Sequence, residues 1–87
     1  MASFHSNEEL FQAVTELAAR FEAAGRAPAA AGLREGMACL NGLTDGWAMF
    51  LEAIEVVWSS DFAQLDADDQ RALRRIRDGV RRALRRR

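Results

Sequence analysis

The chain has 87 residues and a formal net charge of −1 at pH 7, and 49% of its residues are hydrophobic, with 17 alanines among them. A chain of this length forms one small domain with a modest core, and its single cysteine cannot form an internal disulfide. These features exclude a multidomain enzyme, a disulfide-stabilised scaffold and a disordered polyelectrolyte.

The small net charge is the sum of two segments of opposite sign. Residues 1–70 hold twelve acidic residues against three arginines, a balance of −9, whereas residues 71–87 hold nine arginines against Asp78 alone, a balance of +8. Because the chain contains no lysine, the use of arginine is not evidence of selection for phosphate binding. The charge pattern does set the C-terminal segment apart from the rest of the chain.

Helical periodicity dominates the sequence, and no segment alternates with the two-residue period of a strand. The first predicted helix covers residues 7–24, because Ser6 and Glu9 form a capping box before it and Gly25 is a typical residue after a helix end. Its apolar residues recur at helical spacing and define one face: Leu10, Phe11, Val14, Leu17, Ala18 and Phe21.

The second predicted helix covers residues 28–41, with Pro28 in its first turn and Asn41-Gly42 at its end. One face carries the large apolar residues Leu33, Met37 and Leu40. The other face is formed by small residues: Ala31, Gly32, Ala38, Cys39 and Gly42. Because Gly32 and Gly36 each cost a helix interior roughly 1 kcal/mol relative to alanine, we expect another backbone to approach this helix closely.

The third predicted helix covers residues 45–58, with Thr44 or Asp45 as its cap. Its main apolar face is formed by six residues: Trp47, Phe50, Leu51, Ile54, Val57 and Trp58. A second apolar stripe follows i, i+4, i+7 spacing on the opposite side: Met49, Ala53 and Val56. A helix that is apolar nearly all round must be buried nearly all round, which a bundle this small cannot easily provide. The pattern therefore predicts contact with a second chain.

The fourth predicted helix covers residues 66–85. It follows a predicted loop that opens at Ser59-Ser60-Asp61 and contains a single turn near Phe62, and Asp66 is its predicted cap. A narrow apolar seam runs along it, with arginines on the far side: Leu73, Ile76, Val80 and Leu84. Four helices with short connections predict an all-α, antiparallel up-and-down four-helix bundle in a single domain, residues 1–87, with a flexible arm at 1–5 and a frayed end at 85–87.

Few residues in this sequence are suited to catalysis. His5 is the one histidine, and we expect it to be solvated because it precedes the first helix. Glu52 and Glu55 form a Glu-x-x-Glu pair but lack the histidines that carboxylate metal centres use, so we expect them at an exposed edge or paired with arginines of the fourth helix. We therefore expect no enzyme activity, no catalytic residue, no cofactor and no metal site.

Two hypotheses for function remain. The first is a non-enzymatic helical interaction module that forms a homodimer through the second and third helices, using Met49, Ala53, Val56, Gly32 and Cys39. For Cys39 taken alone, the favoured interpretation is a buried, inert position. The second is a nucleic-acid-binding or regulatory protein that contacts phosphates through Arg71, Arg74, Arg75, Arg81, Arg82 and Arg85. The competing interpretation of these arginines is that the chain's own acidic residues cover them.

The expected location is the cytoplasm, without membrane insertion. No stretch approaches 18 consecutive apolar residues, and the N-terminal residues lack the basic and apolar regions of a signal peptide.

Overall fold

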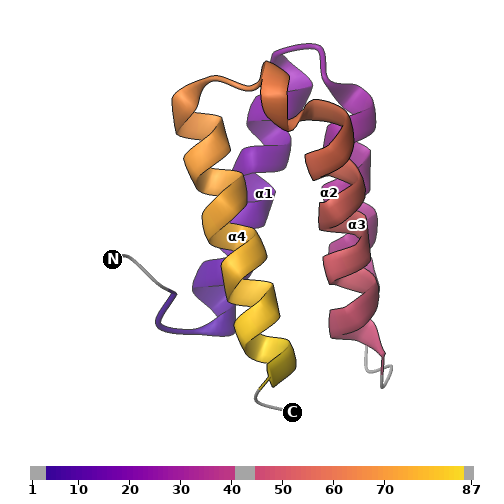
Figure 1. Cartoon of the computed structure of the whole chain (residues 1–87), viewed down its shortest axis with the longest axis vertical. Helices are drawn as coiled ribbons and strands as arrows, with labels where there is room; N and C mark the ends of the chain where they lie inside the picture. Colours follow the sequence, from indigo (N-terminus) through magenta and orange to yellow (C-terminus); the bar gives the residue numbers. More distant parts are fainter. Residues whose placement is uncertain (1–3, 41–44, 86–87) are drawn as a thin grey trace.

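Helices follow one another along the chain, antiparallel from each to the next (Figure 1). The computed structural model describes residues 4–40 and 45–85. Within these ranges the elements are α1 (Asn7–Ala23), α2 (Ala27–Ala38), α3 (Gly46–Asp61), the short 3-10 helix η1 (Phe62–Gln64) and α4 (Ala67–Arg85). Helix α1 contacts α2 and α4, and α3 contacts the same two helices. The predicted all-α four-helix bundle is therefore confirmed.

Side-chain caps begin two of the helices as the sequence predicts. The Ser6 hydroxyl accepts a hydrogen bond from the Glu9 N–H at 3.2 Å, and the Glu9 carboxylate accepts one from the His5 N–H at 2.9 Å. At α4 the Asp66 carboxylate accepts from the Asp69 N–H at 2.8 Å. Each cap satisfies an amide that has no partner within its own helix.

The end of α1 depends on a glycine. Gly25 has a φ of +82°, a left-handed conformation that is easily adopted only by glycine. This conformation lets the Arg26 N–H donate to the Phe21 carbonyl at 2.7 Å and the Gly25 N–H donate to the Glu22 carbonyl at 3.1 Å. These two bonds form a Schellman motif, which turns the chain towards α2.

Two predicted boundaries need correction. Helix α2 ends at Ala38, before the predicted residue 41, and residues 41–44, with the predicted stop at Asn41-Gly42 and the candidate cap Thr44, lie outside the described part of the chain. Asp45 occupies the N-cap position of α3 without a side-chain cap bond.

Helix α3 continues to Asp61, so the loop predicted to open at Ser59 was wrong there. Two contacts accompany the additional residues of this helix, and both involve residues beyond the predicted end at residue 58. Asp61 accepts a hydrogen bond from Arg26 at 3.3 Å, and the Phe62 ring stacks on Trp58 with centroids 4.0 Å apart. The turn predicted near Phe62 is confirmed as η1.

The predicted apolar faces meet in one core. Its largest fully buried side chains come from all four helices: Phe21, Phe50, Leu17, Leu33, Ile54, Leu73, Ile76, Val14 and Val80. A second set is half-buried against this core, including both tryptophans: Phe11, Met37, Leu40, Trp47, Leu51 and Trp58.

Small residues let α2 and α3 approach closely. A methyl group on Gly36 would lie 2.8 Å from Cδ1 of Phe50 and 3.0 Å from Cβ of Ala53. A methyl group on Gly32 would lie 3.0 Å from Cγ2 of Val57. These contacts confirm the close approach expected from two glycines inside one helix.

Phe4, which lies in the predicted arm of residues 1–5, packs against α4. Phe4 is half-buried, and a methyl group on Gly79 would lie 3.0 Å from its Cδ2. The Arg75 guanidinium lies over the same ring, 4.1 Å from its centroid. Periodicity could not reveal this contact, because Phe4 lies outside the first helix.

We predict that Gly36→Ala destabilises the protein even though alanine is the better helix former. The new methyl group would overlap the fully buried Phe50 ring, and overpacking of this kind costs about 1–3 kcal/mol against a gain of about 1 kcal/mol in helix propensity. We expect a net loss of about 1 kcal/mol in the free energy of unfolding, measured by urea denaturation.

Gly79→Ala is the matched control for this substitution. Its nearest neighbours would be the half-buried Phe4 ring, at 3.0 Å, and Cδ1 of Leu10, at 3.5 Å. Phe4 lies outside the helices, so we expect a smaller loss of stability than for Gly36→Ala. A Gly36→Ala protein as stable as the Gly79→Ala protein would contradict the close packing of α2 on α3.

Candidate interaction surfaces

The outer face of α3 carries an exposed apolar patch. Met49 is 42% exposed and Val56 is 64% exposed, and they are the exposed large hydrophobic residues of the described chain. They lie seven residues apart on one side of the helix, with the half-buried Ala53 between them. We call these three residues the α3 patch.

The other two residues predicted for self-association lie where α2 meets α3. Gly32 is next to Val57 of the same chain, so the intramolecular contact already uses the space beside it. Cys39 is half-buried, and its thiol donates to the Glu35 carbonyl at 3.4 Å. The structure thus brings Met49, Ala53 and Val56 together and places Gly32 inside the helix pair.

The arginines of α4 that face α3 are paired with one carboxylate. Glu55 lies 3.6 Å from Arg77 and 3.1 Å from Arg81. This arrangement agrees with the expectation that acids of the third helix pair with arginines of the fourth. Glu52, one turn earlier on α3, is exposed and has no ion pair within residues 4–40 and 45–85.

Aromatic rings contact Arg77 on the α3-facing side of α4 and Arg74 at the start of its outward side. The Arg77 guanidinium lies 3.6 Å from the centroid of the Trp58 ring, and Trp58 stacks on Phe62. Arg74 lies 5.7 Å from the Phe62 centroid. Cation–π contacts of this type hold a guanidinium in place without a carboxylate. The sequence reasoning missed this cluster, although aromatic residues at the end of the third helix were its available signal.

The outward side of α4 carries a row of arginines. Arg71 pairs with Asp68 one turn earlier. Four others are exposed and have no ion pair to the described residues: Arg74, Arg75, Arg82 and Arg85. We call these four residues the α4 arginine row. The chain's own acids therefore cover Arg71, Arg77 and Arg81 but leave this row uncovered within the described ranges.

The remaining ion pairs connect the helices to one another. Arg20 of α1 bonds to Asp69 of α4 at 2.8 Å. Arg34 of α2 bonds to Glu22 of α1 at 3.1 Å. Both pairs lie within the acidic segment, residues 1–70, so arginines of that segment help to fix the positions of its helices.

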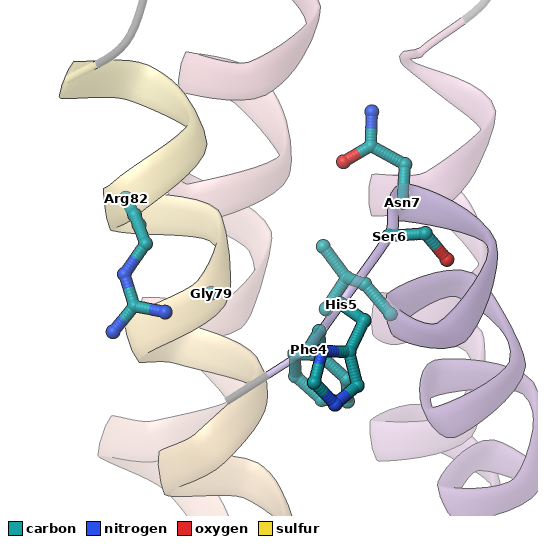
Figure 2. A pocket seen from close by; sticks show the side chains of 7 residues that line it. Phe4, His5, Ser6, Asn7, Gly79 and Arg82 are labelled. Carbon is teal, nitrogen blue, oxygen red and sulfur yellow. The ribbon is translucent and has the colours of Figure 1, made fainter. Parts of the chain in front are cut away.

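A small pocket lies between the start of α1 and α4 (Figure 2). It measures about 40 Å³ and is lined by Phe4, His5, Ser6, Asn7, Leu10, Gly79 and Arg82. His5 is exposed, as predicted, and the Ser6 hydroxyl is engaged by the Glu9 N–H. The pocket is the size of one or two water molecules and cannot contain an organic substrate.

The described residues contain no group of three or more histidine, cysteine or acidic side chains arranged to hold a metal ion. Within the same ranges, no helix combines the length and the apolar character that crossing a membrane requires. Comparison of the chain with protein-family models, with curated proteins and with solved structures gave no match.

We predict that Arg34→Gln raises the pKa of Glu22 towards its ordinary value. The hydrogen bonds from the Arg34 guanidinium, and then its positive charge, hold the pKa of this carboxyl below the ordinary value. Because the pKa is lowered in the folded state, the pair stabilises the fold above the unfolded-state pKa of Glu22, and this contribution is lost as the pH falls through the folded-state value. An NMR titration of the Glu22 carboxyl carbon measures the shift, and an unchanged titration would contradict the pair.

We predict that Glu55→Ala costs about 1 kcal/mol of unfolding free energy, whereas Glu52→Ala is nearly neutral. Loss of Glu55 leaves Arg77, whose side chain is only 19% exposed, without its carboxylate partner. Both substitutions remove one acid from α3, so urea denaturation of the two variants compares the pairing directly. The difference should shrink in about 1 M salt, because screening weakens ion pairs. Equal losses would contradict a stabilising role for Glu55.

Proposed function

We propose that the protein is a non-enzymatic helical interaction module that binds a second copy of itself through the α3 patch. The exposure of Met49 and Val56 carries this proposal. Apart from the half-buried Leu84, the other large apolar side chains of the described residues pack in or against the core. The α3 patch is therefore the apolar surface whose removal from water would contribute most to association.

The spacing of the patch fits a two-fold contact. In an antiparallel pairing of two α3 helices, Met49 would lie against Val56 of the partner subunit. Ala53, which packs against α2, and the exposed Glu52 would lie on either side of the symmetry axis. The same patch then serves both subunits, as a two-fold interface requires.

The size of the patch implies weak association. Full burial of a methionine or valine contributes about 1.5–3 kcal/mol, and both side chains are already partly buried in one chain. The burial of two such residues per subunit offsets the loss of translational and rotational freedom only in part. We therefore expect a dissociation constant on the order of 10 µM, weak enough to be concentration-dependent and tight enough to give a dimer at about 100 µM.

The non-enzymatic part of the proposal rests on residue types. The chain has one histidine and no tyrosine, and His5 lies exposed before α1. Little acid–base chemistry near pH 7 is possible with this set. A single cysteine requires no oxidising compartment, which supports the cytoplasmic location that we propose with this function.

We predict that the protein sediments near twice 9.7 kDa at about 100 µM and that Val56→Glu shifts it to the monomer. The substitution would place two carboxylates in the apolar contact. Analytical ultracentrifugation over a concentration series measures the change.

Ala19→Glu on α1 is the matched control, because it introduces the same side chain at an exposed helical position away from α3. We expect this variant to associate like the unmodified protein. A monomer at about 100 µM without any substitution would overturn the proposal, and equal effects of both substitutions would overturn the assignment of the interface to α3.

A further inference from the structure

We infer that the α4 arginine row binds the phosphate backbone of a nucleic acid duplex without reading its bases. Arg74, Arg75, Arg82 and Arg85 are exposed on α4 and have no carboxylate partner among the described residues. This surface is separate from the α3 patch, so the inference does not depend on self-association.

The row consists of two pairs of arginines on one side of α4. It extends over eleven residue steps of one helix, which is about 16 Å at 1.5 Å per residue. Phosphates on one strand of a duplex recur about every 3.4 Å along its axis, so a helix segment of this length faces several of them. Arg74 and Arg75 form one pair and Arg82 and Arg85 a second, with about 10 Å of helix between the pairs. The two pairs can therefore contact phosphates near either end of this span.

Aromatic contacts prepare part of the row for binding. Arg75 lies over the Phe4 ring and Arg74 lies near the Phe62 ring. A guanidinium stacked on a ring keeps the N–H donors at its edge available to a phosphate. It also loses less conformational freedom on binding than an unsupported side chain does.

The same contacts favour a duplex over a single strand. Single-strand binding uses aromatic faces on which bases stack. Here Trp58 is enclosed between Phe62 and Arg77, and Phe4 lies beneath Arg75. The rings support arginines instead of offering open faces, which leaves phosphate contacts as the available mode.

Readout of base edges has little support on this helix. Gln70 is the one amide side chain of α4, and it donates to the Phe62 carbonyl at 2.8 Å. Asparagine and glutamine are absent after it in the chain. Arginines alone therefore face the ligand, and binding should depend on charge more than on sequence.

An anionic membrane and an acidic protein fit the row less well. Membrane-surface helices insert large apolar side chains, but the exposed ones of the described chain lie on α3. An acidic protein surface rarely offers charges in a regular line of this length, whereas a nucleic acid strand does so by construction.

One acid lies within the row. Asp78 is exposed, four residues after Arg74 and four before Arg82. Its charge should oppose phosphate binding. Removal of this charge therefore tests for a gain of affinity, which a merely destabilised variant would not show.

The test is fluorescence anisotropy of a labelled DNA duplex at pH 7 and about 50 mM salt. If three phosphates are neutralised, affinity should fall about 40-fold between 50 and 200 mM salt. Arg82→Gln should reduce the salt slope by about one, whereas Arg34→Gln, which removes a positive charge from the contact of α1 with α2, should not.

Two further variants strengthen the test. The triple change of Arg74, Arg82 and Arg85 to glutamine should abolish binding while circular dichroism stays helical. Asp78→Asn should raise affinity several-fold, and Glu35→Gln, the same charge change on α2, should leave it unaltered.

Several results would overturn the inference. These are no duplex binding at about 50 mM salt, full binding by the triple variant, or tighter binding of a single strand than of a duplex. If polyglutamate displaces the labelled duplex as strongly as unlabelled duplex does, the row binds an acidic protein instead. Binding to anionic lipid vesicles but not to duplex would assign it to a membrane. A monomeric protein that binds duplex would leave this inference intact while the proposal of self-association fails.

Discussion

The close contact between α2 and α3 determines which side of α3 remains in solvent. Because Gly36 has no side chain, Phe50 and Ala53 approach the α2 backbone directly. The core-facing residues of α3 then point between α2 and α4, and its most apolar remaining side turns outward with Met49 and Val56. A larger residue at Gly36 would separate the helices and change this orientation. The α3 patch is thus a consequence of how the core is packed.

Helix α3 also divides the arginines of α4 into two groups. Glu55 holds Arg77 and Arg81 on the inner side, where Trp58 and Phe62 add cation–π support. These arginines connect the helices and are occupied. The outward arginines face solvent because Asp68 on their side is paired with Arg71, and Asp78 forms no ion pair within the described residues. Helix α4 therefore has an inner side whose arginines bind α3 and an outer side whose arginines are exposed. The near-zero net charge of the chain indicates neither of these two groups.

Most of the fold could be predicted because its signals are local. Helix faces follow from apolar spacing, and the caps at Ser6 and Asp66 and the glycine at residue 25 act within a few residues of themselves. The extension of α3 could not be predicted, since Asp61 is held by Arg26, 35 residues away. The division of the arginines was equally inaccessible, because it depends on which helix lies beside each edge of α4. The number of arginines follows from the composition, but the acidic partner of each arginine depends on the tertiary structure.

The two surfaces differ in physical character, and salt therefore separates them. Contact through the α3 patch removes apolar area from water, a term that added salt does not screen and that excluded salts such as sulfate strengthen. Contact through the α4 arginine row depends on charges that lie within about one Debye length of the ligand, so it weakens as ionic strength rises. Because α3 and α4 are neighbours in the bundle, a single assembly could use both surfaces at once. In that case a rise in salt concentration would release the nucleic acid first and leave the two chains associated. The α3 patch would then be the contact that holds the assembly together.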